Sequence, residues 1–330
     1  MCGPLDVKDG PKTITRISNV SLCAFDCAGY PIARFVVPTI AGSFHYGFVP
    51  PDDTRSCMES STPDRPPIAL TIAGSDSGGG AGIQADLATF AAHGVFGTSA
   101  ITAVTAQHTR GVESAHVLPP EAVGAQIDAV TGDFAVGAAK TGMLATADIV
   151  DLVTERTRNF GFPLVVDPVM VATSGDRLLD ADAEVAYEDL IGEATVVTPN
   201  ADEATVLTGV EIAGREDARD AGERLLEWGV EAALVKGGHV PGETVVDVLV
   251  AGGDDGPTVS ELEHPRIENA ATHGSGCTLS SAIAARLARD EDLESAVAGA
   301  TDFVWRAIRG YADVGRGPGA VNPLVDCEPQ

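Results

Sequence analysis

The segment Ile68-Ala-Leu-Thr-Ile-Ala-Gly-Ser-Asp-Ser-Gly-Gly-Gly-Ala-Gly-Ile-Gln-Ala-Asp86 joins a short apolar run to a glycine-rich turn and the start of a helical pattern. Ile68–Ala73 has the length of a buried strand, and Ile83–His93 has the pattern of a helix. Five of the nine residues in Gly74–Gly82 are glycines, more than a tight turn alone needs. Glycines let a backbone adopt positive φ and pass close to a ligand. The segment therefore predicts a strand, a ligand-contacting loop and a helix.

The same alternation continues downstream. Apolar runs predict strands at residues 98–106, 136–140, 164–167, 195–198 and 232–236. Helical patterns lie between them at residues 119–131, 146–158, 181–191, 200–208 and 214–229. This order favours an α/β fold with a mostly parallel central sheet and helices on both faces. Two further runs at residues 245–250 and 259–262 have no helix between them, so we predict an antiparallel hairpin at the sheet edge. Helices at residues 276–289 and 291–310 complete the fold.

Residues 1–57 differ in composition from the rest of the chain. They contain five acidic and five basic residues, so the net charge of −27 lies in residues 58–330. Asp26 and Pro31 interrupt the one stretch that resembles the apolar core of a signal peptide. We expect residues 1–57 to be an extension that is disordered or arises from a start codon upstream of a natural start at Met58. N-terminal mass spectrometry of the native protein tests this hypothesis.

The charge of the chain excludes several classes of partner. Acidic residues outnumber basic ones by 48 to 21, and such a surface repels nucleic acids and anionic membranes. No apolar stretch is long enough to span a bilayer without interruption by Gly, Pro or a charged residue. The acidic, lysine-poor composition is typical of halophilic proteins, because high salt screens the self-repulsion of an acidic surface.

The six cysteines do not form the pattern of a disulfide framework. Four precede Met58, Cys327 lies near the carboxyl terminus, and Cys277 stands alone within a motif. This distribution predicts a reducing, cytoplasmic location.

Two common nucleotide-binding patterns do not fit the sequence. Gly80-Ala-Gly-Ile-Gln-Ala85 matches G-x-G-x-x-G/A, but residues 98–107 lack the acidic residue that binds ribose in dinucleotide-binding proteins. The Walker A pattern G-x-x-x-x-G-K-[ST] is absent. An oxidoreductase and a P-loop enzyme are therefore both disfavoured.

A second glycine-containing segment, Thr272-His-Gly-Ser-Gly-Cys277, stands at the start of a predicted helix. The backbone N–H groups of Gly274, Ser275, Gly276 and Cys277 are expected to converge where the helix dipole also favours negative charge. Such an anion hole can stabilise a phosphoryl group during transfer. The helix start also favours a thiolate at Cys277. The alternative for this residue is a small side chain that only packs.

Lys140 and Lys236 are the only lysines after residue 57, and each ends a predicted strand. In a chain this poor in lysine, both positions indicate a role that arginine does not fill. We predict a phosphate contact for Lys236, whereas for Lys140 a ligand contact and a buried structural role both stay open. Asp167 and Glu203 follow other strands, and carboxylates at neighbouring strand ends suit a hydrated Mg²⁺ between nucleotide phosphates. Glu203 is also an ordinary residue for the first turn of a helix.

Several separated motifs together resemble the hydroxymethylpyrimidine/phosphomethylpyrimidine kinases of thiamine biosynthesis, a ribokinase-like family. The resemblance runs from Ile68 to about Pro323. Its motifs are Ala-Gly-Ser-Asp76, Gly-Gly-Ala-Gly-Ile-Gln-Ala-Asp-Leu87, Thr-Ala-Gln107, Lys-Thr-Gly-Met143, Asp-Pro-Val-Met170, Thr-Pro-Asn200, Lys-Gly-Gly-His239 and His-Gly-Ser-Gly-Cys277. It implies a ribokinase-like kinase domain over residues 58–330. The family uses ATP and Mg²⁺ to phosphorylate 4-amino-5-hydroxymethyl-2-methylpyrimidine and then its monophosphate. A homodimer is also implied.

The resemblance implies roles for individual residues. Gln107 would bind the pyrimidine edge through its side-chain amide. The rest of the substrate pocket would come from Gly74, Ala81, Asp86 and Met143. ATP would contact Lys140, Asn200, Lys236 and Thr272, and the metal would lie at Asp167 and Glu203. Catalysis would depend on Lys236, Gly274, Ser275, Gly276 and Cys277. Cys277 stands where many ribokinase-like sugar kinases carry an aspartate base.

The sequence departs from the family pattern at two places and leaves alternatives open. Ser77 follows Asp76 where the family usually has proline, and Thr105 stands where an aliphatic residue is common. A pyridoxal-type kinase is the main alternative activity, because related enzymes also carry a glycine-flanked cysteine. A sugar kinase is disfavoured by Cys277. A non-catalytic pyrimidine-binding regulator would be expected to lack Lys236, the anion hole or the acidic positions, and all of these are present.

Overall fold

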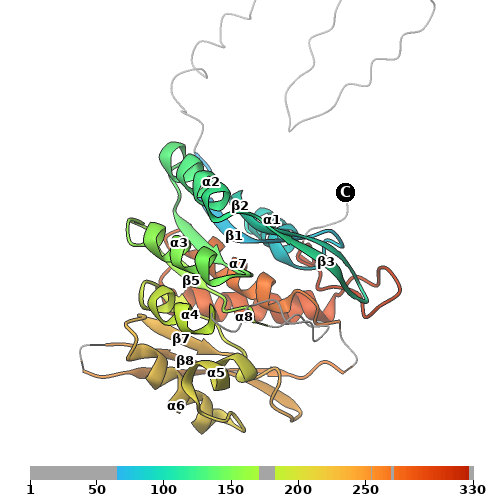
Figure 1. Cartoon of the computed structure of the whole chain (residues 1–330). Coiled ribbons are helices and arrows are strands. Elements are labelled where there is room, and N and C mark those ends of the chain that lie inside the picture. Colours follow the sequence, from blue (N-terminus) through green and yellow to red (C-terminus); the bar gives the residue numbers. More distant parts are fainter. Residues whose placement is uncertain (1–64, 171–182, 254, 269–270, 327–330) are drawn as a thin grey trace, which may run out of the picture. The chain divides into compact units, whose positions relative to one another are not determined.

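The computed structural model describes residues 65–170, 183–253, 255–268 and 271–326. These residues form a nine-stranded sheet with the order β3-β2-β1-β4-β5-β6-β7-β8-β9 (Figure 1). The strands are β1 (Ile68–Asp76), β2 (Phe96–His108), β3 (Gly111–Val117), β4 (Ala138–Thr141), β5 (Leu164–Val166), β6 (Val196–Val197), β7 (Ala232–Val235), β8 (Thr244–Ala251) and β9 (Thr258–Pro265). The predicted domain boundary at residue 58 lies outside the described residues.

The centre of the sheet is parallel. The neighbouring strands β2, β1, β4, β5, β6 and β7 all run in the same direction. Strands β4 to β7 are completely buried, as expected for a parallel sheet that helices cover on both faces. At one edge β8 pairs antiparallel with β7 and with β9. The predicted mostly parallel sheet with an antiparallel edge hairpin is therefore confirmed.

The opposite edge carries a strand that the sequence did not predict. β3 pairs antiparallel with the long strand β2. Five of its residues are exposed, so β3 has no buried face and no apolar period that could identify it. Its backbone hydrogen bonds to β2 hold it in place instead. The turn between β2 and β3 follows Gln107, and this hairpin therefore borders the candidate site.

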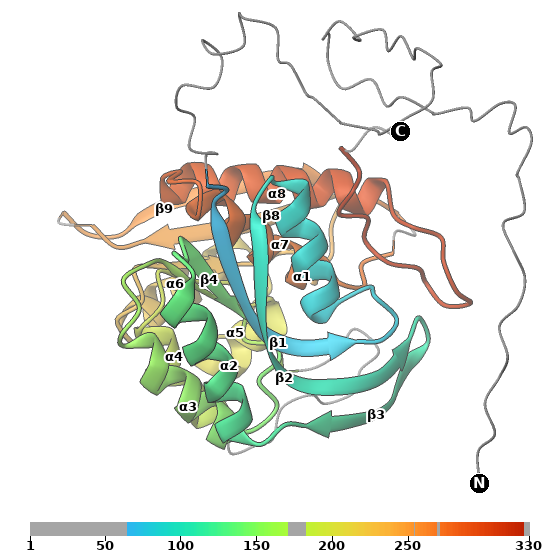
Figure 2. The same ribbon diagram turned by 90° about the horizontal axis from the view of Figure 1, so that it is seen from above.

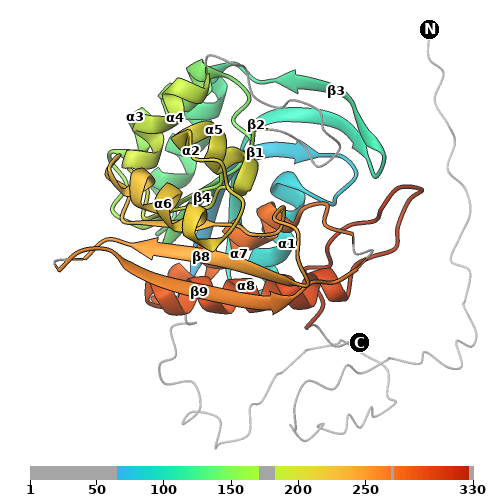
Figure 3. The ribbon, with the colours of Figure 1, turned by 90° about the horizontal axis from the view of Figure 1, so that it is seen from below.

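Helices cover both faces of the sheet (Figure 2). One face carries α1 (Gly82–Ala92), α7 (Ser275–Leu287) and α8 (Leu293–Arg309), which pack together in one apolar cluster. The other face carries α2 (Pro120–Asp133), α3 (Ala147–Thr157), α4 (Ala183–Gly192), α5 (Ala201–Thr208) and α6 (Arg215–Leu226). Figure 3 shows β8 and β9 from below, with β9 beside α8. No helix of the described residues is long and apolar enough to cross a membrane.

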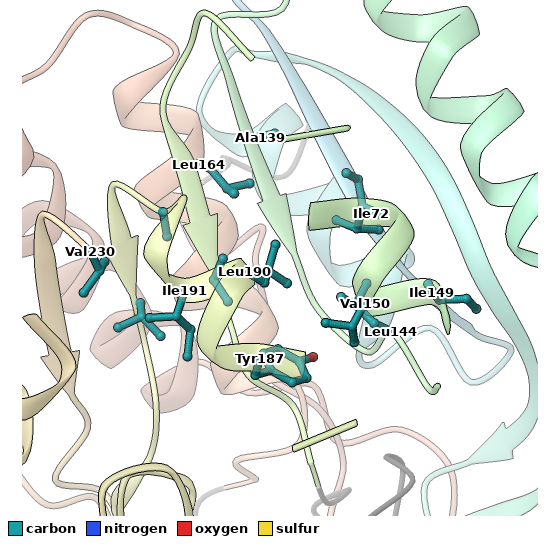
Figure 4. Packing of buried hydrophobic residues seen from close by; sticks show 14 of the residues in the cluster. Ile72, Ala139, Leu144, Ile149, Val150, Leu164, Tyr187, Leu190, Ile191 and Val230 are labelled. Carbon is teal, nitrogen blue, oxygen red and sulfur yellow. The ribbon is translucent and has the colours of Figure 1, made fainter. Parts of the chain in front are cut away.

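A second core cluster lies between the parallel strands and α2, α3 and α4 (Figure 4). Ile72 of β1 and Leu164 of β5 contribute to it from the sheet, while Ile149 and Leu190 contribute from the helices. Burial of each such side chain stabilises the fold by about 1.5–3 kcal/mol. Tyr187 is the largest side chain in this cluster, and its buried hydroxyl has no hydrogen-bond partner among the described residues.

The carboxyl ends of the parallel strands carry the polar residues. β5 ends at Val166 and β7 at Val235, so Asp167 and Lys236 are the first residues beyond their strands. In open α/β sheets, ligands bind at this edge. The fold therefore brings together the two glycine-containing segments and the charged strand ends.

Candidate active site

A cavity of about 730 Å³ opens at the carboxyl ends of the parallel strands. Its middle is lined by Asp167, Lys236 and residues 272–277. We call one side the glycine-loop end, which is formed by Gly74, Ala81, Thr105, Gln107 and Met143. We call the other side the hairpin end, which is formed by Gly238, His239, Val245, Arg266, Ile267, Val304, Trp305 and Ile308. Of the predicted site residues, all except Asp86 and Lys140 line the cavity.

Asp76 organises the glycine loop. Its carboxylate accepts hydrogen bonds from the N–H groups of Gly78 at 2.7 Å, Gly80 at 3.1 Å and Ala81 at 2.9 Å. His273 Nε2 lies 3.2 Å from Asp76 Oδ2. Burial alone would raise the pKa of Asp76, but the hydrogen bond with His273 and those from the loop hold it below its ordinary value. Asp76 therefore joins the loop to the anion-hole segment as a buried carboxylate.

Sequence reasoning did not assign a role to Asp76 or His273. Both residues stood inside motifs that were identified for other reasons. An acidic residue within a glycine-rich loop was the available signal, because such a loop has backbone N–H groups to satisfy. The partner could not be inferred, since the two residues are far apart in the sequence.

Gln107 lies at the glycine-loop end with its side chain already oriented. Its Oε1 accepts a hydrogen bond from Thr105 Oγ1 at 3.1 Å, and its Nε2 lies 3.5 Å from His273 Nε2. Ser77 Oγ accepts a hydrogen bond from the Gln107 N–H at 2.8 Å and donates one to the Gln107 carbonyl oxygen at 2.8 Å. Ser77 therefore ties the glycine loop to the β2–β3 hairpin. The two departures from the family pattern, Ser77 and Thr105, thus both contact Gln107.

Gly74 and Met143 face each other across the same end of the cavity. A Cβ atom at Gly74 would lie 2.5 Å from Met143 Cε. Thr102 Oγ1 donates to the Met143 carbonyl oxygen at 2.6 Å and fixes the backbone there. A side chain at position 74 would therefore displace the flexible end of Met143.

The anion-hole segment turns into α7 at Gly274, whose φ of +84° lies in the left-handed region. The N–H groups of Gly274, Gly276 and Cys277 donate no hydrogen bond within the described residues. The N–H of Ser275, which was predicted to belong to the same set, instead donates to the Thr272 carbonyl oxygen at 3.0 Å. Three of the four predicted amides thus remain available to an anion.

The surroundings of Cys277 do not favour the thiolate that the helix start alone suggests. Burial raises the pKa of this thiol to about 11, although the nearby Lys140 ammonium lowers it in part. The helix start was the only influence that the sequence revealed. Desolvation by the surrounding strands and the carboxylates Asp86 and Asp167 outweigh it. Cys277 is therefore a neutral thiol at neutral pH.

Asp86 and Lys140 form a buried ion pair beneath the cavity rather than part of its lining. Lys140 Nζ lies 3.2 Å from Asp86 Oδ1, and both side chains are 0% exposed. Thr71 Oγ1 and Ser281 Oγ donate to the same carboxylate at 2.6 Å and 2.8 Å. The predicted contacts of Asp86 with substrate and of Lys140 with ATP are therefore corrected, because the two charged groups are partners of each other inside the protein. Together with Thr71 and Ser281 they connect α1, β1, β4 and α7. The sequence left a ligand contact and a buried structural role open for Lys140, and the buried structural role fits its position.

Lys236 lies between two carboxylates at the middle of the cavity. Its Nζ is 3.1 Å from Asp167 Oδ1 and 3.9 Å from Glu203 Oε2. Burial raises the pKa of Glu203 to about 7, Lys236 lowers it in part, and Asp167 raises it further. Asn200 and Glu203 form a capping box at the start of α5, so both side chains also have a structural role.

No group of three or more His, Cys, Asp or Glu side chains in the described parts of the chain is arranged to hold a metal ion. Mg²⁺, however, usually takes only one or two protein carboxylates and completes its shell with water and substrate phosphates. The raised pKa of Glu203 results first from burial, and the neighbouring Asp167 carboxylate adds to it, so a further cation beside the two carboxylates would favour their charged forms. The residues present therefore fit a Mg²⁺ that arrives with phosphates.

The hairpin end was missed by sequence reasoning. Its walls are apolar side chains from β8, from the segment after β9 and from α8, namely Val245, Ile267, Val304 and Ile308. Trp305 Nε1 donates to the Pro265 carbonyl oxygen at 2.9 Å, which holds the indole against the wall. In a sequence, an apolar face on a hairpin or on a terminal helix cannot be distinguished from a face that packs in the hydrophobic core. Only their convergence on one cavity reveals a binding surface.

Comparison with known proteins agrees with this geometry. A profile described as phosphomethylpyrimidine kinase matches residues 76–322. The chain belongs to the phosphomethylpyrimidine kinase family. The resemblance predicted from the motifs is thereby confirmed. A hydroxymethylpyrimidine/phosphomethylpyrimidine kinase from Rhizobium meliloti is 50% identical over 260 residues, which cover 77% of this chain and 96% of that protein. A Streptomyces coelicolor protein of the same name is 48% identical over 261 residues, 79% of this chain and 95% of that protein.

Solved structures show the same ribokinase-like fold. An ADP complex of Bacillus subtilis pyridoxal kinase is 34% identical, with a TM-score of 0.73, and the match covers 79% of this kinase and 98% of that chain. A phosphomethylpyrimidine kinase from Clostridium difficile is 40% identical, with a TM-score of 0.64, and covers 73% of this kinase and 99% of that chain. The predicted fold and enzyme class are therefore confirmed.

Proposed function

We propose that this kinase transfers the γ-phosphoryl group of ATP to the hydroxymethyl oxygen of 4-amino-5-hydroxymethyl-2-methylpyrimidine and then phosphorylates the monophosphate to the diphosphate. One observation carries the proposal. A preoriented side-chain amide, Gln107, shares a cavity with the available N–H groups of Gly276 and Cys277 and with Lys236. The names of the relatives support the choice of substrate.

The pyrimidine occupies the glycine-loop end in this proposal. The Gln107 amide offers a donor and an acceptor to a ring edge that carries an amino group and a ring nitrogen. Gly74 leaves the ring a flat surface beside Met143. The hydroxymethyl group then points toward the amides of Gly276 and Cys277. ATP occupies the hairpin end, so that its γ-phosphate meets this hydroxyl at the middle of the cavity.

Transfer depends on charge stabilisation more than on proton abstraction. Phosphoryl transfer passes through a loose transition state in which charge spreads over the equatorial oxygens. The amides of Gly274, Gly276 and Cys277 donate to those oxygens, and Lys236 offsets their charge. Cys277 is protonated at neutral pH because its pKa is about 11, so it acts as part of this cradle rather than as a base.

Asp167 and Glu203 would hold Mg²⁺. When bound, this ion neutralises charge between nucleotide phosphates. Lys236 lies within ion-pair distance of both carboxylates. As phosphates arrive, Lys236 is drawn toward them, and the two carboxylates keep its ammonium oriented.

A coupled assay of ADP release tests the proposed function. Hydroxymethylpyrimidine, its monophosphate and pyridoxal are compared as substrates in high KCl. We expect the highest kcat/KM with the two pyrimidines. A pyrimidine-independent ADP release, or no turnover with either pyrimidine, would refute the proposal.

Pyridoxal phosphorylation is a second candidate because of one observation. The match to the pyridoxal kinase from Bacillus subtilis extends over almost all of that chain. Both kinds of substrate are flat heteroaromatic rings that carry a hydroxymethyl group. Higher kcat/KM with pyridoxal than with hydroxymethylpyrimidine in the same assay would favour this activity as the main one.

The assembly and surroundings of the enzyme are further parts of the proposal. We expect a cytoplasmic homodimer adapted to high salt, since the net charge of −27 is best tolerated where salt screens it. Light scattering across a KCl series tests the dimer. Loss of activity on dilution into low salt tests the adaptation.

A further inference from the structure

The side chain of Arg266 contacts the loop between β7 and β8 at several points. All three nitrogens of its guanidinium donate to backbone carbonyl oxygens of that loop, Nη1 to Gly238 at 2.9 Å, Nη2 to Val240 at 2.6 Å and Nε to Gly242 at 2.7 Å. Its own N–H donates to the Glu243 carbonyl oxygen at 2.8 Å. Arg266 is half-buried and makes no ion pair with a carboxylate of the described residues. One side chain thus holds three alternate carbonyl groups of the loop.

The contact with Gly238 determines which way the next N–H of the loop points. In a trans peptide the C=O of one residue and the N–H of the next point in opposite directions. Because the Gly238 carbonyl points at Arg266, the N–H of His239 points away from it. The N–H groups of Gly238 and His239 donate no hydrogen bond within the described parts of the chain. Both residues line the cavity.

Gly237, at the start of the same loop, is held against β8. The Gly237 N–H donates to Asp247 Oδ1 at 2.8 Å, and a Cβ atom at Gly237 would lie 2.0 Å from the Val246 carbonyl oxygen. The loop therefore rests directly on β8 immediately after Lys236. Among the residues that line the cavity, Lys236 and Arg266 are the only lysine and arginine. Lys236 lies at the middle of the cavity and Arg266 at its hairpin end.

We propose that Arg266 is a positioning residue for the phosphates of the nucleotide. It holds the Gly238 carbonyl of the β7–β8 loop so that the N–H of His239 is directed at the polyphosphate beside Lys236. This inference rests on the proposed function only in taking ATP as the ligand of the hairpin end. A lysine at this position keeps the charge but loses the planar set of donors that three carbonyls require. For the orientation of the loop, the planar set of three N–H donors is more important than the positive charge.

The test compares Arg266→Lys and Arg266→Met with the wild-type kinase by equilibrium dialysis of ATP without pyrimidine. Both variants are expected to weaken ATP binding by about tenfold or more, since each loses charge-assisted hydrogen bonds that order the loop. KM for the pyrimidine should stay within about twofold, because the glycine-loop end is untouched. Hydrogen exchange at residues 237–243 should become faster in both variants. Arg289→Lys is the matched control, because Arg289 Nη1 donates to a single carbonyl, that of His93, at 2.8 Å and does not line the cavity.

Two outcomes overturn the inference. ATP binding by Arg266→Lys that equals the wild type, with only Arg266→Met impaired, would assign the effect to charge alone. Unchanged exchange at residues 237–243 in Arg266→Lys would show that the arginine does not order the loop. A wild-type kinase that binds ATP but phosphorylates no pyrimidine would refute the proposed function instead, and the comparison of the Arg266 variants would keep its meaning.

Discussion

Replacing Gly274 by alanine tests how closely the two glycine-containing segments must approach. Gly274 has a φ of +84°, and a Cβ atom there would lie 1.8 Å from the Gly80 carbonyl oxygen. Because Cβ atoms essentially never come within 3.0 Å of such an atom, the segments must separate by about 1.2 Å. The anion hole and the glycine loop would then move apart. A displacement of about 1 Å in an active site costs on the order of 100-fold in rate.

Gly209→Ala is the control for the backbone conformation itself. Gly209 has a φ of +73°, and no atom lies within 4 Å of the position of its Cβ. Both substitutions place alanine in the left-handed region at a cost of about 1–2 kcal/mol, but only Gly274→Ala adds the steric clash. We expect Gly209→Ala to lower the melting temperature and to leave kcat unchanged. Gly274→Ala should also lower kcat/KM, by roughly 100-fold relative to Gly209→Ala.

The assay measures ADP release with hydroxymethylpyrimidine at saturating ATP, together with thermal unfolding of both variants. Measuring both separates the loss of the fold from the loss of the site. If Gly274→Ala retains a kcat/KM within about threefold of Gly209→Ala, a rate ratio equivalent to less than about 1 kcal/mol, the close approach of the two segments is not required and the reasoning fails.

Three further predictions concern buried groups. Lys140→Met leaves the Asp86 carboxylate buried without its partner and should destabilise the fold by about 3–5 kcal/mol in urea unfolding; an unchanged midpoint would contradict the ion pair. Cys277→Ala keeps the backbone N–H that belongs to the cradle, so it should retain most of the wild-type kcat, and a large loss of kcat would show that the thiol itself takes part; the pH profile of wild-type kcat between pH 7 and 9 should show no step from this thiol, since its pKa is about 11. Glu203 has a pKa of about 7 in the fold against 4.5 normally, so its burial destabilises the protein increasingly as pH rises from about 4.5 to about 7. Glu203→Gln should therefore raise the melting temperature at pH 8 but not at pH 4, and an equal shift at both values would refute the raised pKa.

The elements and the site differ in how far the sequence could predict them. The buried strands β4 to β7 and the helices between them were predictable, because a parallel sheet buries both faces and leaves uninterrupted apolar runs. The edge strand β3 was not, because its residues are exposed and its pairing with β2 is a contact between backbones. The hairpin end of the cavity was missed for a related reason. Its apolar residues on β8 and α8 cannot be distinguished from core until the two elements face one cavity.

Lys140 and Lys236 show where sequence reasoning stops. Both end parallel strands, and both are exceptional in a chain with so few lysines. Lys236 lies in the cavity between Asp167 and Glu203, whereas Lys140 is completely buried against Asp86. Position along a strand determines which edge of the sheet a residue approaches. Whether that residue reaches solvent depends on the helix that covers it, and α1 and α7 cover Lys140.

The segment Ile68–Asp86 by itself determined a strand, a glycine-rich loop and a helix, because apolar period and glycine content are local properties of a chain. The motif at residues 272–277 likewise predicted backbone N–H groups without partners at a helix start, since such groups are inherent in that geometry. Only the tertiary structure decided that these two segments touch at Gly80 and Gly274, that Asp76 joins them through His273, and that Cys277 is a neutral thiol. These properties depend on desolvation and on distances between residues remote in the sequence, which folding alone brings together.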